Sequence, residues 1–223
     1  NMYVACAKAI ASCHQIDPEA KIAPVMAYSP TYPKDSKPEN ILAAKKSGDL
    51  YRNYMIDVHC RGEYPAYYLR WLRDNGWDFP ISDEEHEILK AGKPDFYAFN
   101  YYRSSCAEYC PEDVSPELVE RYRVDAKRRM LPGICRHIDN PNIEPFPMNQ
   151  WRLDPIGLRV AFRNIYERCH LPLMLCENGL GVPDILTNDF KIHDDYRIDY
   201  LKSHIIAMKE AVKDGIPVIG YHV

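Results

Sequence analysis

The sequence predicts an α/β fold with a parallel sheet, because predicted helices and strands alternate along most of the 223 residues. The clearest strand covers residues 171–176, a short apolar run typical of a strand buried on both faces. The run stops abruptly at Glu177-Asn178-Gly179, which has the composition of a sharp turn. Only four strands are predicted, which is too few to close an eight-stranded barrel.

The first hundred residues are predicted to contain two strands separated by several helices. In order, we expect a helix over 2–13, a strand over 21–27, a turn over 29–33, a helix after Pro38, a helix from Tyr64 to Gly76, a helix ending at Gly92, and a strand over 95–102. Pro65 interrupts the helical periodicity that begins after Pro38 and continues to Gly76. Ser82 and Glu85 have the spacing of a capping box, which predicts the start of the helix ending at Gly92.

Residues 103–153 differ from the rest of the chain because they are rich in proline and lack clean periodicity. We expect them to form a long excursion after the second strand, with one helix near residues 115–127. Asp154 and Pro155 then have the composition of an N-cap and a first helical position, and they predict the start of a regular helix.

The final third of the chain returns to regular alternation. The helix that follows Pro155 has an apolar stripe made of Leu158, Phe162, Ile165 and Cys169. The helix after Asp194-Asp195 is expected to turn its apolar residues inward, namely Ile198, Leu201, Ile205, Met208 and Val212. A last strand is predicted over 216–221.

Composition predicts an ordinary globular protein without nucleic-acid or membrane partners. The hydrophobic fraction is 46%, the charged fraction is 27% and the net charge is −4. No apolar run reaches the roughly 20 residues that a membrane span needs. The eight cysteines form no C-x-x-C pair, so we expect reduced thiols in a cytoplasmic protein and no metal site. No nucleotide-binding or serine-hydrolase motif is present, and no cofactor is expected.

Polar side chains follow two of the predicted strands at the point where each ends. Asn100 and Tyr102 close the strand over 95–102, and Glu177 closes the strand over 171–176. The carboxyl ends of parallel strands share one edge of a sheet, so we expect the three side chains to converge. The alternative interpretations are a solvated glutamate beside a turn and an aromatic strand end packed under a loop.

Five motifs in this order resemble the C-terminal half of glycoside hydrolase family 1, and within it the bacterial 6-phospho-β-glucosidases. The motifs are F-N-Y-Y at 99–102, D-P-x-G-L-R at 154–159, E-N-G-L-G at 177–181, D-D-Y-R-I-x-Y-L at 194–201 and G-I-P-V-x-G-Y at 215–221. The resemblance extends over essentially the whole chain. It implies a partial (β/α)8 TIM barrel, from helix four through strand eight, in which residues 1–223 are the C-terminal half of one catalytic domain. Residues 103–153 would be the loop after strand six.

The resemblance also implies roles for the three converging residues. Glu177 matches the nucleophile of the E-N-G motif, Tyr102 the tyrosine that hydrogen-bonds it, and Asn100 the asparagine that lines the sugar site. The family is retaining, so Glu177 would form a covalent glycosyl-enzyme, with a second carboxyl group about 5–5.5 Å away.

The chain departs from the family pattern in what it omits. The acid/base glutamate of the T-x-N-E-P motif is absent, since no N-E-P occurs among the 223 residues, and residues 1–5 resemble the helix that follows that motif. The loop that grips the 6-phosphate would lie beyond Val223. The resemblance therefore implies a fragment that is inactive alone.

Three functions remain open from the sequence. The first is cleavage of a phosphorylated β-glucoside, such as a phosphorylated disaccharide, by a cytoplasmic enzyme. The second is a β-glucosidase or β-galactosidase that acts on unphosphorylated sugars. The third is a non-catalytic sugar-binding or structural half-barrel that assembles with a second chain. For the protein as a whole, a homo-oligomer or association with the missing N-terminal half remains open.

Overall fold

The centre of the molecule is a parallel four-stranded sheet. The computed structural model describes residues 2–124 and 129–223. The sheet order is β1-β3-β7-β8, and all neighbouring strands are parallel. The strands are β1 (Val25–Ala27), β3 (Tyr97–Asn100), β7 (Leu173–Glu177) and β8 (Val218–Tyr221). Spatial order follows chain order, as in a segment of a barrel wall, and the predicted α/β class with a parallel sheet is confirmed.

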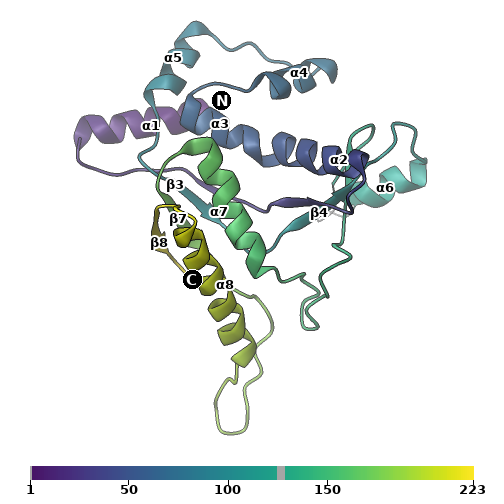
Figure 1. The fold of residues 1–223 in the computed structure, drawn as a ribbon. Helices are drawn as coiled ribbons and strands as arrows, with labels where there is room; N and C mark the ends of the chain where they lie inside the picture. The colour runs from purple at the N-terminus through teal and green to yellow at the C-terminus, as the bar shows by residue number, and fades with distance from the viewer. Residues whose placement is uncertain (1, 125–128) are drawn as a thin grey trace.

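Helices connect these strands and cover the sheet (Figure 1). They are α1 (Met2–Ile16), α2 (Pro38–Gly48), a π-helical turn η1 (Asp49–Asn53), α3 (Tyr54–Arg61), α4 (Ala66–Asp74), α5 (Asp83–Ala91), α7 (Pro155–Cys169) and α8 (Asp195–Lys213). The segments α2, η1 and α3 form one continuous helical path, since the residues at their junctions keep right-handed helical backbone angles. This path packs against α7, which in turn packs against α8.

The predicted helix starts are found where the capping residues lie. The Ser82 hydroxyl accepts a hydrogen bond from the Glu85 amide at 3.2 Å, and the Glu85 carboxylate accepts from the Ser82 amide at 3.1 Å. This reciprocal pair satisfies two amides at the start of α5. Asp154 caps α7 by accepting from the Gly157 amide at 2.8 Å, and Pro155 occupies the first turn.

The main core lies between the parallel sheet and α7. Phe99 of β3 meets Phe162 of α7 edge-to-face, with ring centroids 5.0 Å apart. The predicted stripe on α7 is confirmed at Leu158, Phe162 and Ile165, all fully buried, and Cys169 is half-buried. Apolar burial on this scale is the principal term that stabilises the sheet–helix layer.

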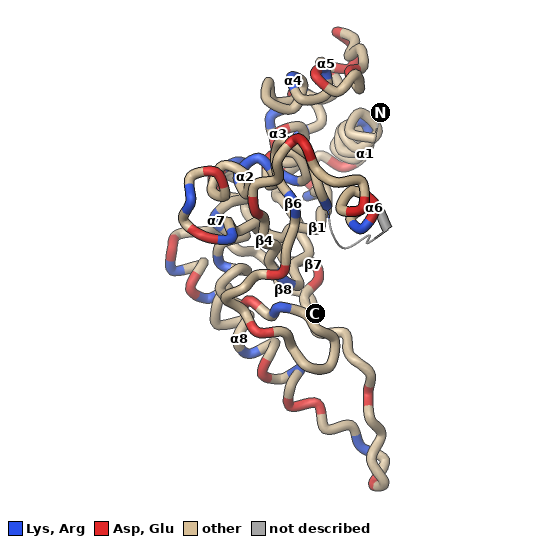
Figure 2. Tube along the Cα trace, turned by 90° about the vertical axis from the view of Figure 1, so that its right-hand side faces the viewer, with Lys and Arg blue, Asp and Glu red and all other residues tan. Residues whose placement is uncertain are grey.

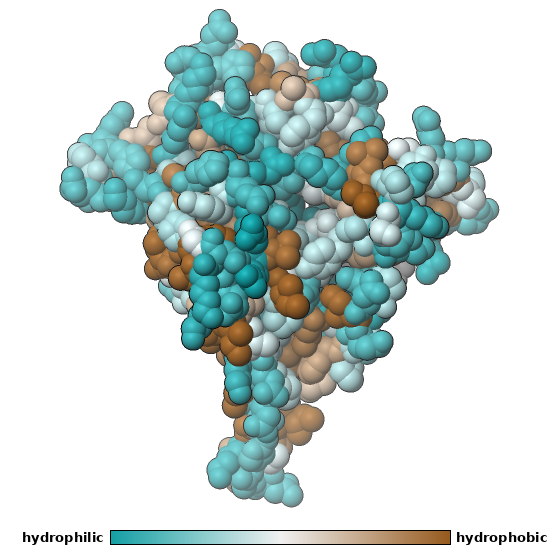
Figure 3. Space-filling view, viewed as in Figure 1, coloured by the Kyte–Doolittle hydropathy of each residue, from teal (hydrophilic) through white to brown (hydrophobic). Residues whose placement is uncertain are grey.

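The predicted inward stripe of α8 is wrong at three of its five positions. Ile198, Ile205 and Val212 are exposed, and the buried side chains of this helix are instead Tyr200, His204, Ala207 and Ala211. The buried set lies on a neighbouring face of the helix, because small alanines and ring side chains allow α8 to approach α7 and the sheet closely. Hydrophobic side chains are consequently exposed on the lower part of the face seen in Figure 3.

A second sheet occupies much of the segment that was expected to be irregular. Its order is β2-β4-β6-β5, with strands β2 (Thr31–Pro33), β4 (Ser105–Glu108), β6 (Cys135–Ile138) and β5 (Met130–Leu131). Strand β2 lies within residues 29–33, so the turn predicted there is wrong at 31–33. These strands have two to four residues each, too short for periodicity to reveal. Helix α6 (Pro116–Val124) matches the helix expected near 115–127, of which residues 125–127 lie outside the described residues.

The surface carries charges of both signs, distributed over the helices and loops (Figure 2). The loop between β7 and α8 projects away from the body of the molecule in Figures 1 and 2. None of the helices in the described part of the chain is both long enough and apolar enough to cross a membrane.

Candidate active site

Asn100 and Glu177 are cross-strand neighbours at the carboxyl edge of the parallel sheet. The register pairs Asn100 of β3 with Glu177 of β7, after a bulge at Phe99/Asn100. A bulge changes the direction of the residues that follow it, and bulges are common beside active sites. The Asn100 Oδ1 atom is buried and has no hydrogen-bond partner among the described residues. It is therefore a free acceptor at the strand end.

Tyr102 completes the cluster that the sequence predicted. Its hydroxyl donates a hydrogen bond to Glu177 Oε2, and the Glu177 carboxylate is otherwise exposed at the rim. This hydrogen bond, with a smaller contribution from burial, raises the pKa of Tyr102 to about 12. The phenol consequently remains a neutral donor at physiological pH and fixes the orientation of the carboxylate.

Asn178 holds the ends of three elements together, which sequence reasoning missed. Its Nδ2 donates to the Tyr101 carbonyl at 2.7 Å and lies 3.0 Å from the Tyr200 hydroxyl of α8. Its Oδ1 accepts from the Tyr221 hydroxyl of β8 at 3.0 Å. Asn178 is 2% exposed, so these bonds replace those it would make to water. An asparagine before glycine suggests only a turn, and nothing in the sequence alone distinguishes the buried amide.

Tyr200 extends this support to the residue that contacts the carboxylate. Its hydroxyl donates to the Tyr102 carbonyl at 3.0 Å, and its ring stacks on His204 with centroids 3.9 Å apart. Through this hydrogen bond, helix α8 holds the backbone of Tyr102 in place. Tyr200 lies within the D-D-Y-R-I-x-Y-L motif, whose sequence gave no indication of this contact.

The backbone before Tyr102 is anchored on the start of α7. The Tyr101 hydroxyl donates to the Asp154 carbonyl at 2.6 Å. Gly157 packs directly against both residues, and a Cβ placed there would overlap the Tyr101 hydroxyl and lie 2.8 Å from Asp154 Cγ. The glycine of the D-P-x-G-L-R motif is explained by this close approach.

Trp151 places part of the 103–153 segment beside Tyr102, at the carboxyl edge of the parallel sheet. Its ring lies 6.0 Å from the ring of Tyr102, and the Arg103 guanidinium lies 5.4 Å from the indole centroid. A cavity of about 260 Å³ opens beside Trp151, with Ser104 and Arg152 in its lining. The excursion therefore provides an aromatic and cationic wall next to the carboxylate.

The arrangement provides an oriented carboxylate, a neutral donor on it and a free amide acceptor at the strand ends of a parallel sheet. Such a rim suits nucleophilic attack on carbon, with the acceptor binding a substrate hydroxyl. Within residues 2–124 and 129–223, no cluster of three histidine, cysteine or acidic side chains could hold a metal ion.

A parallel sheet in chain order with polar residues at the carboxyl ends of its strands is the arrangement of part of a (β/α)8 barrel. Comparison with known proteins agrees with this fold: residues 1–223 match the protein family described as "Glycosyl hydrolase family 1". The chain belongs to glycosyl hydrolase family 1.

Curated relatives of this chain include several phospho-β-glucosidases. It is 39% identical over 222 residues to an aryl-phospho-beta-D-glucosidase, BglC, from Bacillus subtilis (strain 168), covering 98% of this chain and 46% of the relative. It is 37% identical to the 6-phospho-beta-glucosidase AscB from Escherichia coli (strain K12), covering 98% of this chain and 43% of that protein. The chain thus spans less than half the length of these relatives, and the predicted resemblance to 6-phospho-β-glucosidases is confirmed.

Solved structures establish the fold. A β-glucosidase from Exiguobacterium marinum superimposes with a TM-score of 0.79 at 21% identity, covering 99% of this chain and 46% of that one. A family 1 β-glucosidase from Thermotoga maritima gives a TM-score of 0.75 at 23% identity, covering 96% of this chain and 44% of that one. The predicted partial (β/α)8 TIM barrel is confirmed.

The contact between Tyr102 and Glu177 leads to a prediction for Tyr102→Phe in the protein expressed at full length. Loss of a hydrogen bond to a charged group removes about 1.5–3 kcal/mol, so kcat/KM is expected to fall about ten- to hundredfold. Tyr109→Phe, at an exposed position outside the rim, is the matched control. Unchanged kcat/KM in Tyr102→Phe would show that the hydroxyl does not position the carboxylate during the reaction.

Proposed function

We propose that this chain forms part of a retaining glycoside hydrolase that cleaves 6-phospho-β-glucosides through a covalent glycosyl-enzyme on Glu177. The contact of Tyr102 with the Glu177 carboxylate is the observation that carries the proposal. Attack requires an ionised and correctly oriented carboxylate beside the anomeric carbon, and a fixed neutral donor supplies that orientation.

Asn100 and Trp151 have complementary roles in this proposal. The unpartnered Oδ1 of Asn100 would accept a hydrogen bond from a sugar hydroxyl, which would satisfy an otherwise orphaned buried acceptor. The Trp151 indole would provide an apolar face against which a sugar ring or aryl group packs. Neither residue transfers a proton, so both are binding residues.

The specificity for phosphorylated substrates is supported by the names of the relatives at 35–39% identity. A phosphorylated sugar as substrate also favours a cytoplasmic location. We further propose that residues 1–223 are the C-terminal half of a single catalytic domain, in which 103–153 form the loop after barrel strand six.

The substrate proposal is tested by comparing a 4-nitrophenyl 6-phospho-β-glucoside with its unphosphorylated counterpart. We expect the protein at full length to favour the phosphorylated substrate by more than about tenfold in kcat/KM, because phosphate contacts are charge-assisted hydrogen bonds. Equal rates, or preference for the plain glucoside or galactoside, would assign the protein to the unphosphorylated alternative. Failure to hydrolyse either substrate would contradict the glycosidase proposal itself.

Residues 1–223 expressed alone are expected to turn over β-glycosides very poorly. They contain the proposed nucleophile but no N-E-P sequence, and the loss of general acid catalysis alone reduces rates by roughly 10²–10⁴-fold. Hydrolysis of a 4-nitrophenyl 6-phospho-β-glucoside by this segment and by the full-length protein gives the comparison. Turnover by the segment at a rate close to that of the full-length protein would show that its acid lies among the 223 residues.

A further inference from the structure

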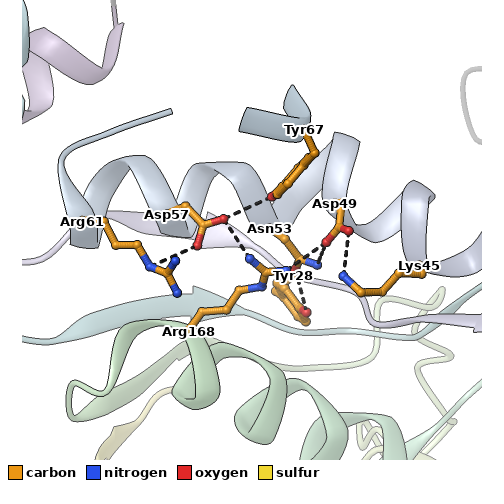
Figure 4. A network of polar contacts seen from close by, with 8 residues as sticks. All are labelled: Tyr28, Lys45, Asp49, Asn53, Asp57, Arg61, Tyr67 and Arg168. Atoms are coloured by element: carbon orange, nitrogen blue, oxygen red, sulfur yellow. Dashed lines mark hydrogen bonds and ion pairs between the residues drawn. The ribbon is translucent and has the colours of Figure 1, made fainter. Parts of the chain in front are cut away.

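A groove of about 430 Å³ separates the helical path α2–η1–α3 from α7. Its walls come from the two helices and from residues 28–31, and none of Asn100, Tyr102 and Glu177 contributes to it. Small-molecule sites commonly have volumes of about 300–1,000 Å³. Figure 4 shows the polar side chains between the two helical layers at this place. The groove is therefore large enough for a small ligand and is separate from the catalytic rim.

Cationic side chains dominate the lining of this groove. The lining contains four cationic side chains and one carboxylate. The cations are Lys45, Arg52, Arg61 and Arg168, and the carboxylate is Glu167. Two further carboxylates lie behind the lining. Asp49 accepts from Lys45 at 2.7 Å and from Arg168 at 2.9 Å, and Asp57 pairs with Arg168 at 2.8 Å and Arg61 at 3.6 Å. Lys45, Arg61 and Arg168 are thus each paired with Asp49 or Asp57, whereas Glu167 lies 4.0 Å from Arg163, which is outside the lining.

Arg52 is the one cation of the described lining residues without a carboxylate partner. Its guanidinium donates only long hydrogen bonds, at 3.3 Å to the Thr31 hydroxyl and 3.4 Å to the Ser105 hydroxyl, and it makes no ion pair with a carboxylate of the described residues. Burial, and secondarily the charge of Arg129, lowers the pKa of Arg52 to about 10. A desolvated guanidinium without an anion is costly, because five strong donors are left with weak partners.

We propose that this groove is a binding site for a small sugar phosphate or polyol phosphate, whose phosphate contacts Arg52. A planar guanidinium fork binds two oxygens of a tetrahedral oxyanion at once. The Thr31 hydroxyl and the exposed Lys45 ammonium also line the groove and are further donors for the remaining phosphate oxygens. The groove exceeds the volume of a bare ion, and its polar walls, including Asn53 and Asn164, suit a hydroxylated organic part.

The π-helical turn Asp49–Asn53 gives this site its shape. A π turn carries one additional residue, and such turns in α-helices frequently occur at functional sites. Here it contains Arg52 together with Asn53, which both line the groove, and Asp49, which holds Lys45 and Arg168 from behind. The same turn thereby places the unpaired guanidinium and fixes the cations around it.

Calorimetric titration of the full-length protein with glycerol phosphate tests the proposal. We expect saturable binding that weakens about tenfold to hundredfold in Arg52→Met, as loss of hydrogen bonds to a charged group predicts. Arg52→Lys retains the positive charge but lacks the planar guanidinium, so its affinity for glycerol phosphate should lie between those of the wild-type protein and Arg52→Met. Lys45→Gln changes an exposed side chain at the groove, should fold normally, and should weaken binding about two- to fivefold.

Lys213→Gln is the matched control, since Lys213 is equally exposed and pairs with Glu210 on a helix outside the groove. It should leave the affinity unchanged. Absence of saturable binding to the wild-type protein would overturn the proposal. Binding that Arg52→Met and Lys45→Gln leave unchanged would overturn it too, because the ligand would then occupy another place, such as the catalytic rim.

Discussion

Glu177→Ala in the full-length protein is expected to reduce hydrolysis of an aryl 6-phospho-β-glucoside by more than the roughly 10²–10⁴-fold that loss of a general acid or base produces. The proposed reaction forms a covalent bond between a Glu177 oxygen and the anomeric carbon while the aglycone oxygen leaves. Without the carboxylate this step has no nucleophile, and the oxocarbenium-like transition state also loses a facing negative charge.

Azide provides the diagnostic readout for this variant. The shortened side chain leaves space at the rim for a small anion, which can attack the anomeric carbon in place of Glu177. We expect azide to restore turnover of an activated aryl substrate and to give a glycosyl azide of inverted anomeric configuration, because only one displacement occurs. Glu87→Ala, on the exposed surface of α5, is the control and should retain full activity. Near-normal activity of Glu177→Ala without azide would exclude Glu177 as the nucleophile.

The parallel sheet could be predicted from the sequence because its signals are local. The apolar run ending at Glu177 reads as a buried strand, and the caps at Ser82 and Asp154 lie within three residues of their partners. Strands β2, β4 and β6 could not be predicted, since each is very short and pairs with a segment distant in the chain. Strand β5 pairs with the adjacent β6, but it has only two residues and shows no periodicity. The pairing of β2, β4 and β6 is a property of the tertiary structure.

The buried face of α8 shows why helical periodicity alone can mislead. The predicted stripe includes Ile198 and Ile205, because hydrophobicity favours isoleucine over Ala207 and Ala211 as an inward residue. The structure buries the alanines because closely packed helices need small side chains at the contact. His204 and Tyr200 join them, and Tyr200 reaches the Tyr102 carbonyl.

The positions of Asn100, Tyr102 and Glu177 could be predicted from the sequence, whereas the buried contacts that hold these residues in place could not. Strand-end position was sufficient to bring Asn100 and Glu177 into register and Tyr102 into contact with the carboxylate. The buried amide of Asn178 depends on hydroxyls from α8 and β8, which are 22 and 43 residues away in sequence. Such contacts require the three-dimensional arrangement, because a single sequence contains no signal for them.

The ion-pair network behind the groove gives the largest expected effect on stability. Asp57 is 2% exposed, and its carboxylate accepts from Arg168 at 2.8 Å and from the Tyr67 hydroxyl at 3.1 Å (Figure 4). Arg168 also reaches Asp49, and it thereby links α7 to both the π turn and α3. Arg168→Met would retain most of the apolar volume but leave the Asp57 carboxylate buried with Tyr67 and the more distant Arg61.

Arg168→Met is therefore expected to lower the free energy of unfolding of the full-length protein by about 3 kcal/mol, the lower end of the range for breaking a buried ion pair. The lower end applies because Arg61 and Tyr67 remain to offset part of the loss. Urea unfolding monitored by circular dichroism measures the effect. Arg70→Met removes an exposed pair with Asp74 on α4 and should change the free energy by less than about 1 kcal/mol.

A second substitution separates the charge from the packing. If the loss in Arg168→Met comes from an unpaired carboxylate, then adding Asp57→Asn to that variant should recover part of the free energy, because the neutral amide has a smaller desolvation penalty. Two substitutions in contact are not expected to be additive, and the sign of the interaction energy reports their coupling. If Arg168→Met is no more destabilising than Arg70→Met, then solvent reaches Asp57 in the native protein, and the network contributes little to joining α3 and α7.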